Sequence, residues 1–150
     1  MTALIKLSWQ EPEMRVISHL RELDESLKDW ERYQQCSLEE LKTDRDTRNM
    51  ILHAMLVSIQ TAIDISSYLI AQNGLKRPAT YRETFELLAQ ANLIPEELAS
   101  ELSDLAGFRN VLVHIYWNLN YDEIYSILQN DLKTLRYFRD EIKELLSKGG

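Results

Sequence analysis

Four polar side chains that could act together lie within the segment 109–116: Arg109, Asn110, His114 and Tyr116. Arginine presents its donors in a planar fork that matches the oxygens of a phosphate group. Histidine can give or take a proton near neutral pH. These residue types, spaced so closely, indicate chemistry on a phosphodiester.

The spacing limits how these side chains can cooperate if the segment is helical. Each helical residue advances about 100° around the axis, so Asn110 and His114 lie on nearly the same face. Arg109 lies about 140° from His114, and its long stem must wrap around the helix for both to reach one phosphate. The apolar residues between them are expected to anchor the helix in the core: Val111, Leu112 and Val113.

A single histidine leaves the chemistry incomplete. Attack by a ribose 2′-hydroxyl requires a base on that hydroxyl and an acid on the leaving 5′-oxygen. A symmetric dimer with its two-fold axis beside this helix would bring two copies of His114 to one groove. Such a dimer is one way to supply both proton-transfer groups.

The segment also follows the pattern Arg-x4-His-x-Tyr. In this it resembles the HEPN-domain ribonucleases of the HepT type, the toxins of HepT/MntA toxin–antitoxin systems. The resemblance runs from about Asp44, through the sequence AIDI at residues 62–65, to the sequence NYDEIYSIL that follows the motif.

This resemblance implies an all-α, HEPN-like homodimer that cleaves RNA, either tRNA or mRNA, at the dimer interface. It implies cleavage without a metal or cofactor, leaving a 2′,3′-cyclic phosphate. His114 would be the general acid or base, Arg109 would hold the phosphate, and Asn110 would orient the phosphate or the 2′-hydroxyl. Tyr116 would be the residue to which a partner antitoxin, an MntA-like minimal nucleotidyltransferase, attaches AMP from ATP. That group would block the groove and compete for Arg109.

Two other interpretations stay open. The chain could be a non-catalytic HEPN module that partners a nucleotidyltransferase and presents Tyr116 as its substrate. Alternatively it could be a purely structural helical dimer. In that case His114 would bind a local carbonyl group, and Arg109 would form a surface ion pair with Asp104 or Glu101.

Helices must position this segment, because apolar residues recur at helical spacing throughout the chain. The sequence predicts one domain over residues 1–150, an up-and-down bundle of four main helices with short helices after Ser37 and Thr80. The main helices are expected from after Pro12 to near residue 35, over residues 45–72, from Pro95 through the motif to about Tyr116, and over residues 122–145.

Apolar stripes and capping residues support these boundaries. Ser37 and Thr80 each precede a glutamate by three residues, the pattern of a capping box, and Asn73-Gly74 is a typical helix stop. Asp44 can cap the helix that follows it. Two stripes are expected to be buried: Ile17, Leu20, Leu23, Leu27 and Trp30 in the first helix, and Ile51, Met55, Ser58, Ala62, Ile65 and Leu69 in the second.

Asp64 is a polar residue within the second stripe. Its apolar neighbours predict partial burial, and buried carboxylates are normally paired. Its partner could be a helix terminus or an arginine. A sharper hypothesis is that Asp64 orients Arg109 or the motif helix from behind.

The overall charge opposes general binding of nucleic acid. The chain has 17 Lys and Arg against 24 Asp and Glu, a net charge of −7, which repels RNA. A local positive groove remains possible. Its potential contributors, which are more simply explained as solvated surface charges, are Arg45, Arg48, Lys76, Arg77 and Arg82.

Cysteine and apolar content bear on metal binding and location. Cys36 is the only cysteine, so the sequence has no cysteine cluster for zinc and no intrachain disulfide, as suits a reducing cytosol. The histidines are scattered, and no metal site is expected. No uninterrupted run of about 18 apolar residues occurs. We therefore expect a cytoplasmic protein that does not enter a membrane.

Overall fold

Helices form all of the regular structure in residues 2–114 and 118–149, the part of the chain that this computed structural model describes. Side chains are described for residues 14–114 and 118–148. The helices are α1 (Thr2–Tyr33), α2 (Leu38–Thr43), α3 (Arg45–Gln72), α4 (Tyr81–Gln90), α5 (Glu96–His114), α6 (Tyr121–Asn130) and α7 (Leu132–Gly149). The all-α fold class predicted from the sequence is confirmed.

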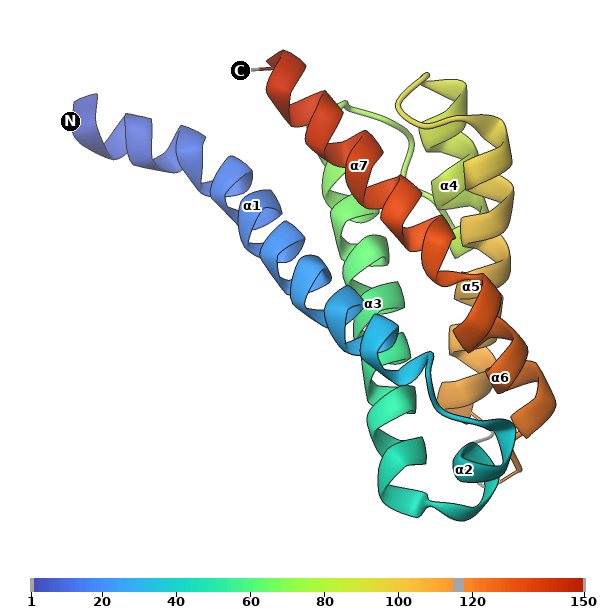
Figure 1. Ribbon diagram of the computed structural model, residues 1–150. Helices are drawn as coiled ribbons and strands as arrows, with labels where there is room; N and C mark the ends of the chain where they lie inside the picture. Colours follow the sequence, from blue (N-terminus) through green and yellow to red (C-terminus); the bar gives the residue numbers. More distant parts are fainter. Residues whose placement is uncertain (1, 115–117, 150) are drawn as a thin grey trace.

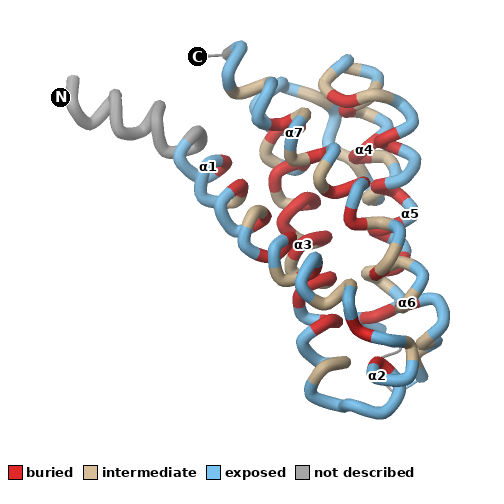
Figure 2. Tube along the Cα trace, viewed as in Figure 1, coloured by how far each residue is buried: buried red, intermediate tan, exposed pale blue. Residues whose placement is uncertain are grey.

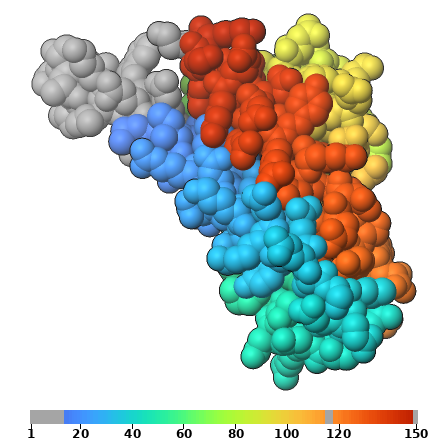
Figure 3. Space-filling model, viewed as in Figure 1, coloured from blue at the N-terminus to red at the C-terminus, as the bar shows by residue number. Residues whose placement is uncertain are grey.

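The four long helices α1, α3, α5 and α7 form the bundle, as predicted, and the short helices complete its sides (Figure 1). The most extensive packing is between α1 and α3 and between α4 and α5. On the face drawn in Figure 3, α7 lies against α1. Helix α5 descends beside α4 toward the end of the bundle where α2 lies.

The core lies between the inward faces of these helices, where buried residues gather (Figure 2). All six members of the predicted α3 stripe are buried. In α1 the prediction fails at Ile17, which is 41% exposed, while Val16 is buried in its place. Leu20, Leu23 and Leu27 are buried as predicted.

Local capping chemistry sets several helix ends. Ser37 and Glu40 form the predicted reciprocal capping box, and the side chain of Asp44 caps α3 by accepting from the Thr47 amide. After α3, Gly74 adopts a φ of 62°, a conformation that glycine reaches without strain.

Two predicted boundaries are wrong. The first helix begins at Thr2, ahead of Pro12. The single helix expected over residues 122–145 is two helices separated at Asp131. The Leu128 carbonyl, which a continuous helix would pair with the amide of residue 132, instead accepts from Trp30 Nε1 at 2.9 Å and Gln34 Nε2 at 3.0 Å. Contacts with α1 thus take the place of that helical bond.

Helix α3 is the one described helix long and apolar enough, by length and composition alone, to cross a membrane. However, 61% of its apolar window is buried inside the protein. Its apolar character is therefore accounted for by its central place in the bundle.

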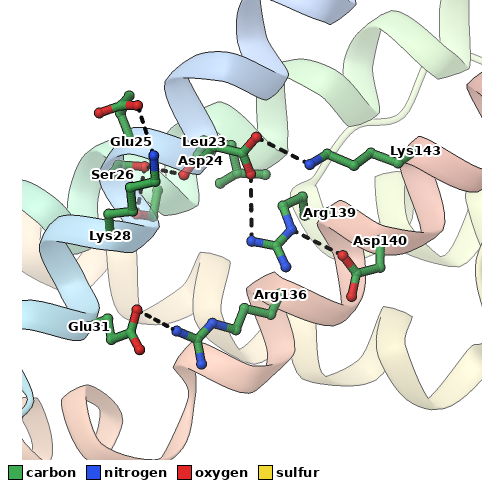
Figure 4. Close-up of polar contacts among 11 residues, drawn as sticks. Leu23, Asp24, Glu25, Ser26, Lys28, Glu31, Arg136, Arg139, Asp140 and Lys143 are labelled. Atoms are coloured by element: carbon green, nitrogen blue, oxygen red, sulfur yellow. Dashed lines mark hydrogen bonds and ion pairs between the residues drawn. The ribbon is translucent and has the colours of Figure 1, made fainter.

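Charged side chains also join α1 to α7 (Figure 4). The Asp24 carboxylate lies 3.5 Å from Nη1 of Arg139 and 3.2 Å from Nζ of Lys143. Arg139 contacts Asp140 at 3.1 Å as well. Asp24 and Arg139 are both largely shielded from solvent, unlike the local pair of Lys28 and Glu25 on α1.

We expect Asp24→Asn to lower the free energy of unfolding by about 1 kcal/mol, because it weakens two inter-helix pairs at once. Glu25→Gln, the matched control, should lower it by less than about 0.5 kcal/mol, since the Lys28 pair is solvated on both sides. Urea unfolding of the two variants measures this difference. Equal losses in the two variants would contradict a special role for Asp24.

Candidate active site at the end of helix α5

The three polar residues predicted to do chemistry lie in the last two turns of α5. Arg109 and Asn110 are half-buried, and His114 is the exposed final residue of the helix. Asn110 and His114 are four residues apart and so lie on nearly the same side of the helix. Tyr116, the fourth predicted residue, lies outside the described residues.

The Arg109 guanidinium is held by two neighbours. Its Nη1 donates to Oδ1 of Asn110 at 3.1 Å, and its central carbon lies 6.0 Å from the centre of the Tyr81 ring. Tyr81 is the first residue of α4, so the arginine is supported from a second helix. A cation over an aromatic face at this distance is attracted by the ring. Arg109 and Asn110 therefore form a pre-positioned pair.

The carboxylates that were alternative partners for Arg109 are engaged elsewhere. Asp104 lies 4.0 Å from Nη2 of Arg82, and Glu101 accepts from the Thr134 hydroxyl at 3.0 Å. The surface ion pair considered for Arg109 is therefore not what its described contacts show. Among the described residues, the contacts shown for its guanidinium are with an amide and a ring, and neither group carries a negative charge.

A hollow lies on either side of this pair. One, of about 300 Å³, is lined mainly by apolar atoms of α3 and α5, with Arg109 and Val113 contributed by α5. The other, of about 440 Å³, is lined by α3, the link before α4, the start of α4, and Asn110. Arg109 and Asn110 thus stand between two surface depressions.

Asp64 reaches this region through a neighbour. Its Oδ1 accepts from Gln60 Nε2 at 2.9 Å, one turn away on α3. Gln60 lines the hollow that Arg109 lines, and its Oε1 is buried without a hydrogen-bond partner among the described residues. The partner of Asp64 shown here is therefore neither a helix terminus nor an arginine. The carboxylate fixes the Gln60 amide in the wall beside Arg109.

The expectation that three apolar residues anchor the motif in the core is wrong for two of them. Leu112 is buried, but Val111 and Val113 are 46% and 48% exposed. Helices α3, α4 and α7 contact α5, yet together they leave these two side chains uncovered. Two exposed valines therefore lie between the polar pair and His114 in the helix.

Among the basic residues proposed for a positive groove, Arg48 has structural contacts. Nη1 of Arg48 donates to the carbonyls of Leu41 and Lys42, and its guanidinium lies 5.2 Å from the Tyr121 ring centre. It therefore joins α2, α3 and α6, and describing it as a solvated charge was wrong. Lys76 and Arg82 have acidic neighbours at 3.6 Å and 4.0 Å. Within the described residues, no three His, Cys, Asp or Glu side chains gather as a metal site would require.

A protein-family model shows which family this chain belongs to. Residues 23–142 match the model "Ribonuclease HepT-like". The chain belongs to the HepT-like ribonuclease family. The resemblance seen in the motif is confirmed, and the match extends from α1 to α7.

Individual proteins that resemble this chain in sequence or structure support its place in the HepT-like family. The chain is 33% identical over 104 residues to the mRNA nuclease HepT of Shewanella oneidensis, covering 69% of this chain and 78% of that protein. It superposes with a TM-score of 0.78 on the tri-AMPylated HEPN toxin of the same organism, solved in complex with its MNT antitoxin. That match has 28% identity and covers 86% of this chain and 96% of the other. The cytosolic protein YutE of Bacillus subtilis shares the fold, with a TM-score of 0.80 at 17% identity over 91% of this chain and 92% of that protein.

The protein is thus a homologue of HepT-type ribonuclease toxins, as predicted. Tyr81 and Gln60 support its HepT-like motif from other helices, and the sequence did not predict either of them. Neither is near residue 109 in the chain, and neither stands out by type or spacing. The one available signal was the capping pattern at Thr80, which placed a helix start at Tyr81 without saying what it would contact.

We expect Arg109→Lys to reduce kcat/KM for RNA about 10–100-fold, although the positive charge is kept. An ammonium group has no planar fork, so it could not donate to Asn110 and to a substrate phosphate in the same way. The matched control is Arg82→Lys, a surface arginine whose change should leave cleavage within about twofold. Steady-state kinetics on one RNA oligonucleotide measures both. Parent-like activity of Arg109→Lys would mean that charge alone is used at this position.

Proposed function

We propose that this HepT-like protein is a toxin that cleaves RNA without a metal ion, using the 2′-hydroxyl of the substrate as nucleophile. The observation that supports this most is the Arg109–Asn110 pair, held at 3.1 Å beside the exposed His114 at the end of α5. A relative named as an mRNA nuclease gives mRNA as the first substrate to test, with tRNA as the second.

In the proposed reaction the 2′-oxygen attacks phosphorus and the bond to the 5′-oxygen breaks, leaving a 2′,3′-cyclic phosphate and a free 5′-hydroxyl. One His114 imidazole takes the proton of the 2′-hydroxyl, and a second, protonated imidazole gives a proton to the leaving 5′-oxygen. Arg109 stabilises the charge that develops on the phosphate oxygens, and Asn110 orients the phosphate or the 2′-hydroxyl.

The second imidazole would come from a second copy of the chain. The exposed Val111 and Val113, with the apolar hollow that Val113 lines, form a surface suited to burial in an interface. A two-fold axis beside this end of α5 would place both copies of His114 in one groove. We therefore propose a homodimer whose active site is built by both protomers, with Asp64 holding its wall through Gln60.

We also propose that a partner antitoxin, an MntA-like nucleotidyltransferase, switches the toxin off by attaching AMP to Tyr116 in the cytoplasm. Support comes from the solved relative, whose toxin is AMPylated and bound to an MNT antitoxin. A further solved toxin–antitoxin complex, with AMP-PNP, matches this chain with a TM-score of 0.79 at 27% identity, covering 86% of this chain and 97% of the other. A phosphodiester two residues beyond His114 would add bulk and a negative charge near Arg109.

We expect Tyr116→Phe to abolish this modification, because phenylalanine has no hydroxyl to accept the adenylyl group. Intact-mass analysis after incubation with the nucleotidyltransferase and ATP measures it. Tyr121→Phe, on the first residue of α6, is the matched control and should be modified as the parent is. Equal modification of Tyr116→Phe and the parent would show that another residue is the target.

The proposed ribonuclease is tested by incubating unmodified protein, shown by mass to carry no AMP, with tRNA and mRNA in EDTA. We expect cleavage with cyclic-phosphate ends. If clean, dimeric protein leaves both RNAs intact, the proposal fails and the non-catalytic partner of a nucleotidyltransferase takes its place. Expression without the antitoxin should stop growth under the first function and be harmless under the second.

A further inference from the structure

Among the described residues, Asn110 is the one residue of the proposed phosphate chemistry that lines the larger of the two hollows beside the motif. This hollow measures about 440 Å³, within the range of cavities that hold small ligands. It opens between α3, the link that precedes α4, and the last two turns of α5. Because Asn110 lines it, an RNA bound at the motif would lie next to this hollow.

The lining suits a flat, partly polar ring. Pro78 and Tyr81 contribute rigid apolar rings, and aromatic side chains are the surfaces on which proteins commonly stack unpaired bases. Hydroxyl groups of Ser67, Thr80 and Thr84 also line the hollow. Such groups can donate to or accept from the edge of a base.

Two of these hydroxyl groups are held in place by the start of α4. The Thr84 hydroxyl donates to the Thr80 carbonyl at 3.0 Å, and the Thr80 hydroxyl accepts from the Glu83 amide at 3.0 Å. Thr84 is buried, so its position is set by the fold. This end of the hollow is therefore pre-formed.

The hollow shares residues with the phosphate-binding pair. Asn110 lines it and accepts from Arg109, while Tyr81 lines it and lies against the Arg109 guanidinium. A phosphate held by Arg109 would therefore have the hollow as its immediate neighbour. A single-stranded RNA places a base directly beside each phosphate.

We propose that this hollow is a nucleobase subsite, which binds the base of a nucleotide flanking the scissile phosphate. The inference rests on the proposed ribonuclease function and adds to it the residues that select and orient the substrate. Stacking on Tyr81 would hold the RNA backbone over Arg109 and His114, so that a base in the hollow speeds cleavage.

The test fills the hollow without touching the catalytic residues. The double variant Ser67→Leu with Ala79→Leu puts two branched side chains on exposed lining positions, where the fold should tolerate them. Its matched control, Gln35→Leu with Gln72→Leu, adds the same side chains at exposed positions outside the hollow. Thermal unfolding verifies that both variants fold as the parent does.

The substrates are a short RNA with one cut site and two copies of it that each lack one base, on the 5′ or the 3′ side of the cut. We expect the parent and the control to cleave the complete RNA about tenfold faster, in kcat/KM, than one of the abasic copies. The filled variant should cleave the complete RNA with the low kcat/KM that the parent has on that abasic copy. Its own kcat/KM on the abasic copy should be no lower.

If the parent cleaves RNA and the filled variant keeps the full preference for the complete substrate, the subsite is wrong and the ribonuclease stands. If the parent cleaves nothing, the proposed function fails, and binding decides the subsite separately. Adenosine and uridine monophosphates, added to the labelled parent, should then shift the amide resonances of Ser67, Tyr81 and Thr84. The same shifts in the filled variant, or none in the parent, would overturn the inference.

Discussion

Replacing His114 by alanine is expected to lower the rate of RNA cleavage at least about a hundredfold, and up to about 10⁴-fold. General acid–base catalysis by a positioned side chain contributes in this range. In a composite site the substitution removes the base on the 2′-hydroxyl and the acid on the 5′-oxygen together. Methyl side chains can replace neither, and water would have to carry both protons.

The same variant should fold as the parent does. His114 is exposed at the last residue of α5, so its truncation removes little buried surface. His53→Ala is the matched control, because His53 is an exposed histidine on α3 that the proposed chemistry does not use. It should cleave at the parent rate. Single-turnover cleavage in EDTA measures both variants, and parent-like cleavage by His114→Ala would remove this residue from the mechanism.

Trp30→Ala is expected to have the largest effect on stability, lowering the free energy of unfolding by about 3–5 kcal/mol. The Trp30 side chain is fully buried between α1 and the rest of the bundle, and its Nε1 donates to the Leu128 carbonyl at 2.9 Å. Domains of this size are stable by about 5–15 kcal/mol in all, so the loss is a large part of the total.

The lost volume should outweigh the lost hydrogen bond. The Leu128 carbonyl also accepts from Gln34 Nε2 at 3.0 Å. We expect this second bond to remain in the variant, so that the carbonyl does not become an unpaired buried acceptor. Trp30→Phe separates the two effects, because it keeps much of the ring and loses the donor. We expect it to cost about 1–2 kcal/mol.

Urea unfolding at one fixed protein concentration measures these losses, since a dimer's stability depends on concentration. A cost for Trp30→Phe that equals the cost for Trp30→Ala would show that the hydrogen bond, and not packing, holds α1 to α6.

The helices and most of their boundaries could be predicted from the sequence, because they depend on local interactions. The stripe from Ile51 to Leu69 repeats at helical spacing, and it is buried. The caps at Ser37 and Asp44 act on amides three residues away. The motif from Arg109 to His114 is equally local, since one helix carries all three side chains. Residues near in sequence are near in space on a helix, and so their pattern could be read directly.

Features whose partners are distant in the chain could not be predicted from the sequence. The helix break at Asp131 depends on Trp30 and Gln34, which are 98 and 94 residues from the Leu128 carbonyl that they bind. Apolar spacing alone continues across that break without interruption. No local signal could show that α1 would take the place of a helical hydrogen bond.

The same distinction holds at the site. Val111 and Val113 are apolar like Leu112, so residue type predicts that all three are buried. The packing of neighbouring helices buries only Leu112. Arg109 gains its ring contact from Tyr81, at the start of α4, and the wall beside it comes from Gln60 on α3. The sequence predicts which polar groups could act on a phosphodiester. The burial of the motif residues and their contacts with other helices depend on the fold, because the elements involved are far apart in the chain.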